Sequence, residues 1–133
     1  MTEEQPTGRF QPLPRRDSDG RSVIAAENVR AELRRILRRS ELVVESGRET
    51  FAEGAAHYDV ASMVVIRLAA VLERPEFAAS AGLLSFDEIT AIKATRNLAA
   101  HAGYIGMNDE LFWAAVTVRI PEIIRRLLDG KPQ

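Results

Sequence analysis

Apolar residues recur at helical spacing along most of this chain, and no stretch shows the strict alternation of a strand. In the first periodic segment they return every three or four positions, and Gly47 follows the last of them. We therefore expect a helix from about Ser22 to Gly47. The stripe that would face the core consists of Val29, Leu33, Ile36, Leu37 and Val44.

A second helix is expected over Tyr58–Glu73, because this segment is apolar around most of its circumference and Pro75 follows it. Such a helix should be the most buried one of the fold. A third helix is expected to begin at Ser85 and Glu88, which form the S-x-x-E pattern of a capping box. This third helix should run to about His101.

The fourth expected helix begins at Asn108, a favoured N-cap residue. It contains Pro121, which lacks a backbone donor and should bend the helix. Its inward stripe would be Phe112, Val116, Ile120, Ile124 and Leu127. Together these segments predict an all-α fold, a compact antiparallel bundle of four main helices.

Composition narrows the kind of protein. The chain has 133 residues, of which 46% are hydrophobic and 28% charged, and this fits a single globular domain. Residues 1–21, with their prolines and polar side chains, are expected to form a flexible tail, and residues 22–129 the helical domain. The sequence shows no signal peptide and no membrane-spanning stretch, so we expect a cytoplasmic protein.

Cysteine content and charge exclude several kinds of chemistry. Cysteine is absent, which excludes disulfides, thiolate metal sites and cysteine nucleophiles. The net charge is only −1, so contact with RNA would need a local patch rather than a global positive field. Arginines on the first helix are one candidate patch, although the glutamates among them favour an ordinary solvated face. These arginines are Arg30, Arg34, Arg35, Arg38 and Arg39.

The third helix carries the residues with catalytic character. Arg96 falls in the same sector as Ile89 and Ile92, so it lies on an apolar stripe and needs an anionic partner. His101 follows five residues later, about 140° around the helix, and shares a flank with Asn97. Arg96 and His101 would therefore meet one substrate most naturally at a cleft between two subunits.

Arginine, histidine and asparagine suit the cleavage of RNA by its own 2′-hydroxyl. The reaction needs a proton taken from that hydroxyl and one given to the leaving 5′-oxygen, and histidine can do either near neutral pH. Arginine stabilises charge on the phosphate oxygens, and no metal is required. On spacing alone a structural role is favoured, with an arginine that reaches solvent and a histidine that caps the last carbonyls.

The wider sequence resembles the HEPN ribonucleases, and within them the HepT-like toxins. Residues 96–101, RNLAAH, match the R-x4-H signature, including the asparagine that often follows the arginine. The likeness continues through GYIG at 103–106, LFW at 111–113 and Pro-Glu at 121–122, and it covers most of residues 24–128. The family usually spaces its tyrosine as H-x-Y, whereas one additional residue separates His101 from Tyr104 here.

The resemblance implies an all-α fold that dimerises, with an active site at the dimer cleft. It implies a metal-independent endoribonuclease, the toxin of a toxin–antitoxin pair, in which Arg96 and His101 are catalytic and Asn97 assists. It also implies a nucleotidyltransferase antitoxin of the MntA type, which attaches AMP to Tyr104. Two alternatives stay open: a non-catalytic HEPN module that binds such a partner and a nucleotide or RNA, and a helical interaction domain in which Arg96 pairs with an acid across the dimer.

Overall fold

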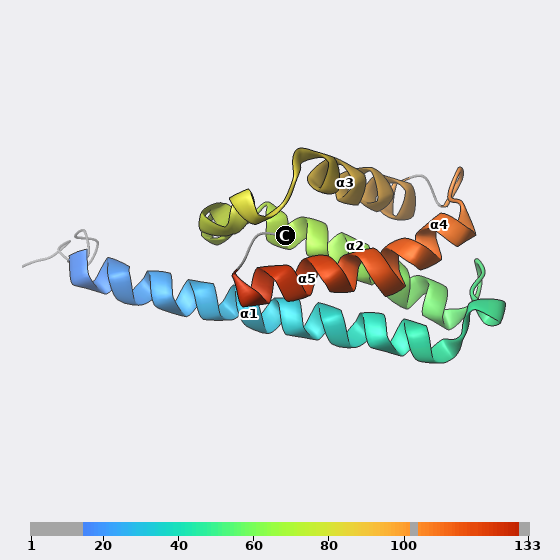
Figure 1. Cartoon of the computed structure of the whole chain (residues 1–133), viewed down its shortest axis with the longest axis horizontal. Coiled ribbons are helices and arrows are strands. Elements are labelled where there is room, and N and C mark those ends of the chain that lie inside the picture. Colours follow the sequence, from blue (N-terminus) through green and yellow to red (C-terminus); the bar gives the residue numbers. More distant parts are fainter. Residues whose placement is uncertain (1–14, 102–103, 131–133) are drawn as a thin grey trace, which may run out of the picture.

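The computed structural model describes residues 15–101 and 104–130, and every regular element in these ranges is helical. This confirms the all-α prediction. The long helices are α1 (Arg15–Ser46), α2 (Ala56–Leu72) and α3 (Phe86–Ala100), and Figure 1 shows their arrangement. The last stretch comprises α4 (Asp109–Ala114), a π-helical turn η4 (Ala115–Arg119) and α5 (Ile120–Asp129). Two short 3₁₀ helices, η2 (Arg48–Thr50) and η3 (Pro75–Leu83), lie in the connections.

The start of α1 differs from the prediction. The helix begins at Arg15 rather than near Ser22, so residues 15–21 of the expected tail are helical, while residues 1–14 lie outside the described residues. Among the side chains of α1 that the structure describes, Val29 is the first buried one, and the N-terminal part of the helix extends past the other helices (Figure 1). Residues 15–21 carry no apolar stripe from which a helix could be predicted, and Gly20 lowers the helix propensity of this segment.

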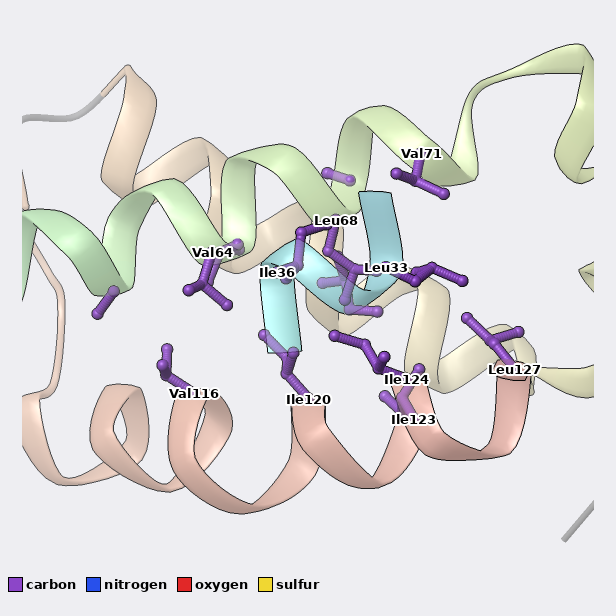
Figure 2. Packing of buried hydrophobic residues seen from close by; sticks show 14 of the residues in the cluster. Leu33, Ile36, Val64, Leu68, Val71, Val116, Ile120, Ile123, Ile124 and Leu127 are labelled. Carbon is purple, nitrogen blue, oxygen red and sulfur yellow. The ribbon is translucent and has the colours of Figure 1, made fainter. Parts of the chain in front are cut away.

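The core forms where α1, α2 and α5 converge. In Figure 2 the side chains of Val64 and Leu68 on α2 point toward those of Ile120 and Ile124 on the C-terminal helix, with Ile36 of α1 between them. The inward stripe predicted for the last helix is buried at all its positions, and α2 carries the most buried side chains of the described helices. Full burial of an aliphatic side chain contributes about 1.5–3 kcal/mol, so this cluster is the main source of stability.

The predicted capping box fixes the start of α3. The Glu88 amide donates to Ser85 Oγ at 3.0 Å, and the Ser85 amide donates to Glu88 Oε1 at 2.8 Å. Arg126 of α5 donates to the same carboxylate at 2.8 Å and to the Leu83 carbonyl at 3.2 Å. The first turn of α3 is therefore tied to the C-terminal helix, while its length packs on α2.

The expected disturbance at Pro121 takes the form of the π-helical turn that precedes it. The Ile120 amide donates to the Ala115 carbonyl, one residue further back than in an α-helix. The hydroxyl of Thr117 donates to the Trp113 carbonyl at 2.7 Å. The helix continues through the proline, which stands near the start of α5, where a missing backbone donor is tolerated.

Candidate functional site

Arg96 faces the C-terminal end of α2. Its Nη1 lies 3.8 Å from Glu73 Oε2, and its side chain is 23% exposed. Its Nε donates to Asn97 Oδ1 at 2.8 Å, which fixes the orientation of the guanidinium. The anionic partner expected for an arginine on an apolar stripe is therefore Glu73 of the same chain.

His101 is the C-cap residue of α3 and is exposed. Its backbone amide donates to the Asn97 carbonyl at 3.0 Å. The side-chain amide of Asn97 contacts Arg96 rather than the imidazole, so it orients the guanidinium. Within residues 15–101 and 104–130, no hydrogen bond or ion pair joins the side chains of Arg96 and His101.

Tyr104 is held against the N-terminal part of α2. Its hydroxyl donates to Asp59 Oδ1 at 3.1 Å and accepts a hydrogen bond from Ser62 Oγ at 2.9 Å. Burial raises the pKa of Tyr104, the bond from Ser62 lowers it, and the carboxylate of Asp59 raises it further, with a net rise. The hydroxyl is thus protonated at neutral pH and points at a carboxylate that can accept its proton.

An aromatic cluster packs against Tyr104. Tyr58 meets Tyr104 edge to face, with ring centroids 4.9 Å apart, and it also contacts Phe51 and Phe112. The Tyr58 hydroxyl donates to Asp109 Oδ1 at 2.8 Å. Burial, followed by the bond to Asp109, raises the pKa of Tyr58 well above its ordinary value. Tyr58 therefore joins the start of α2 to the start of α4.

The helix expected over Tyr58–Glu73 contains Asp59 and Ser62, but the sequence did not predict their contacts with Tyr104. The available signal was their spacing, since residues three apart lie on one side of a helix. Nothing in the local sequence indicated that a residue 45 positions later would reach them.

Two of the candidate arginines of α1 form ion pairs with glutamates of the same helix. Arg35 pairs with Glu32 at 3.2 Å, and Arg38 pairs with Glu41 at 3.3 Å. Glu32 also accepts two hydrogen bonds from Arg67 of α2, at 2.7 and 3.0 Å, and this bidentate contact lowers the pKa of the carboxyl. These ion pairs favour a structural role for the arginines of α1 over a role in binding phosphate.

The described residues contain neither a cluster of metal-ligating side chains nor a helix that could span a membrane. No group of three or more histidine, cysteine, aspartate or glutamate side chains is arranged to hold a metal ion. No described helix is both long and apolar enough to cross a membrane.

Comparison with known proteins adds no family assignment. No protein-family model, no curated protein and no solved structure matches this chain. The site is therefore interpreted from its own residues and from the motif that they form.

Proposed function

We propose that this protein is a metal-independent endoribonuclease of the HEPN class, the cytoplasmic toxin of a HepT-like toxin–antitoxin pair. The observation that supports this most is the arrangement at the end of α3. A partly buried guanidinium is oriented by Asn97, and an exposed imidazole lies at the helix terminus. His101 is the acid or base for the 2′-hydroxyl and the leaving oxygen, and Arg96 stabilises phosphate charge.

Glu73 does not prevent Arg96 from binding a phosphate. The contact between the two side chains is long, at 3.8 Å, and the Glu73 side chain is 53% exposed. Ion pairs of this kind contribute about 0–1 kcal/mol, so a phosphate oxygen can replace the carboxylate at small cost. The bond from Arg96 to Asn97 is compatible with this exchange, because the remaining guanidinium donors stay available.

The active form is proposed to be a dimer of HEPN-like antiparallel bundles. Arg96 and His101 are about 140° apart around α3, and their side chains share no contact. Two copies with their α3 ends facing each other would bring Arg96 of one copy toward His101 of the other. Each cleft would then hold the complete set of groups that the reaction needs.

This proposal is tested by cleavage of RNA in EDTA. The purified chain should cut RNA, and Arg96→Ala should lower the rate roughly 100-fold or more. Arg125→Ala, which removes an exposed arginine of α5, should not. Mixing and re-equilibrating Arg96→Ala with His101→Ala should restore part of the activity, because mixed dimers regain one complete cleft. If Arg96→Ala cuts as well as the parent, the proposal is wrong.

A nucleotidyltransferase antitoxin is the proposed partner, with Tyr104 as the acceptor of AMP. The tyrosine oxygen would attack the α-phosphorus of ATP and release pyrophosphate, and its proton would pass to Asp59. The hydrogen bond from the hydroxyl to Asp59 supports this role for the carboxylate. The bond from Ser62 holds the oxygen in place.

One observation favours a second candidate, a non-catalytic HEPN module that binds the same partner. Arg96 is paired with Glu73 inside one chain, as expected for an arginine with a structural role. In that case Glu73→Gln and Arg96→Ala would lower stability by similar amounts, and the parent protein would not cut RNA. In the ribonuclease, Glu73→Gln should preserve or increase cleavage.

A further inference from the structure

A cavity of about 280 Å³ lies between α3 and the continuous helix formed by η4 and α5. Val65 of α2 is among its lining residues, and the two walls come from residues 87–95 and 115–123. It involves neither His101 nor Tyr104, and it is separate from the proposed ribonuclease site.

The cavity lies between two attachments of α3 and its following loop to neighbouring helices. At one end Arg126 bonds Glu88 and the Leu83 carbonyl. At the other end Tyr104, which follows α3, packs its ring on Tyr58 of α2. Between these ties the facing positions are small, namely Ala91 and Thr95 on α3 and Ala115 on η4. Small side chains leave the space between the two walls unfilled.

The interior of the cavity is apolar. Val65 is fully buried, and three isoleucines that also line the cavity are at most 5% exposed. They are Ile92, Ile120 and Ile123. A dry apolar cavity of roughly 150 Å³ can hold a benzene molecule. The larger volume here accommodates an aromatic ring together with a short alkyl chain.

Charge at the rim is predominantly negative. Asp87 and Glu88 of α3 and Glu122 of α5 line the opening, with Arg119 as the one cation of the lining. Glu88 is neutralised by Arg126 at 2.8 Å. Asp87 is exposed, and no ion pair involves it in the part of the chain that the structure describes. The acidic groups lie at the end of the cavity that is formed by the first turns of α3 and α5.

We propose that this cavity binds a small aryl-alkyl cation, with its ring between Ile92 and Ile120 and its ammonium group at Asp87 and Glu122. An apolar pocket with a few polar groups at its mouth is the usual arrangement of a small-molecule site. Burial of the ring drives binding, and the carboxylates select the charge of the head group. Arg119, on the same wall as Glu122, repels a cation and so opposes its binding.

The test is a titration of the full chain, followed by NMR, with three compounds of similar shape. They are 2-phenylethylammonium, neutral 2-phenylethanol and anionic 3-phenylpropionate. We expect the cation to bind most tightly and the anion most weakly. Asp87→Asn or Glu122→Gln should weaken binding of the cation about twofold to fivefold, and Arg119→Ala should strengthen it by a similar factor. The alcohol should respond to none of these changes.

A filling variant tests the location. Ala91→Leu puts a larger side chain into the cavity and should abolish binding of the cation and of the alcohol. Ala94→Leu is the matched control, since Ala94 is exposed on the same helix and does not line the cavity. Thermal unfolding of each variant shows that it is folded. Absence of binding by the parent, stronger binding of the anion, or equal binding by Ala91→Leu and Ala94→Leu would each overturn the proposal. None of these outcomes depends on RNA cleavage.

Discussion

Tyr104 has a φ of 69°, in the left-handed region that residues with side chains seldom adopt. Such a conformation costs about 1–3 kcal/mol and persists only where surrounding contacts fix it. Here the backbone amide donates to the Leu98 carbonyl at 3.1 Å, and the hydroxyl bonds Asp59 and Ser62. The same contacts that hold the strained residue also direct its oxygen to a carboxylate.

The first prediction concerns the hydroxyl of Tyr104. Tyr104→Phe should lower the free energy of unfolding by about 0.5–1.5 kcal/mol, the usual contribution of such bonds, as measured by urea denaturation. The loss stays small because Ser62 also lies 3.1 Å from the Tyr58 carbonyl and can donate there instead. A loss above about 3 kcal/mol would show that the hydroxyl has a larger structural role than we infer.

The second prediction concerns the proposed role of Asp59 as the acceptor of the Tyr104 proton. If Asp59 accepts the proton of Tyr104, then Asp59→Asn should slow AMP transfer roughly 100-fold. Glu53→Gln is the control, because Glu53 is exposed nearby and only influences the tyrosine through its charge. Incorporation of labelled AMP from ATP by the antitoxin measures both variants. Equal rates for the two would exclude a role for Asp59 as the base.

At the scale of the elements, the attachment of α3 to the rest of the fold depends on the contacts of its first turn. Glu88 completes the capping box and receives a hydrogen bond from Arg126, and the latter bond is the main cause that lowers the pKa of the carboxyl. A carboxyl with a lowered pKa in the folded state stabilises that state above its ordinary pKa of 4.5. This contribution is lost as the pH falls through the lower, folded-state value.

The third prediction follows from the lowered pKa of Glu88 in the folded state. The parent protein should lose stability as the pH falls below about 4.5, and part of the loss should be absent in Glu88→Gln. At pH 7 the same variant should be about 1.5–3 kcal/mol less stable than the parent, because a bond to a charged group is weakened. Urea denaturation from pH 7 to pH 3 measures both effects, with Asp87→Asn as the control. Parallel pH profiles for Glu88→Gln and the parent would contradict this account of the junction.

The fourth prediction concerns α1, in which the described side chains from Val23 to Asn28 are exposed, apart from the half-buried Ala25. A chain that starts at Val23 should unfold within about 0.5 kcal/mol of the parent, because surface residues contribute little. Leu33→Ala, in the core, should cost about 2–5 kcal/mol. Thermal and urea unfolding of both variants provide the comparison. A large loss on truncation would mean that the extended part of α1 contacts something, such as a second copy.

For the whole molecule, the periodic apolar stripes predicted the α-helices of the core, although Val44 of the first stripe is exposed and Val43 is buried instead. The capping signals at Ser85 and Asn108 are used as expected. The sequence did not predict η3 or the start of α1 before Ser22, since neither segment carries an apolar stripe. Nor did it predict the contacts between helices that form the candidate site. Arg96 was expected to need an acid, but the choice of Glu73 depends on how α3 lies on α2.

The central claim is that His101 moves a proton during RNA cleavage, and the chain provides its own control. His57 is the other of its two histidines and is also exposed, in the first turn of α2. The decisive measurement is the initial rate of RNA cleavage in EDTA at neutral pH by His101→Ala and by His57→Ala. We predict that His101→Ala is slower than the parent by roughly 100-fold or more, while His57→Ala keeps the parent's rate. Equal rates for the two variants, or no cleavage by the parent, would contradict the account.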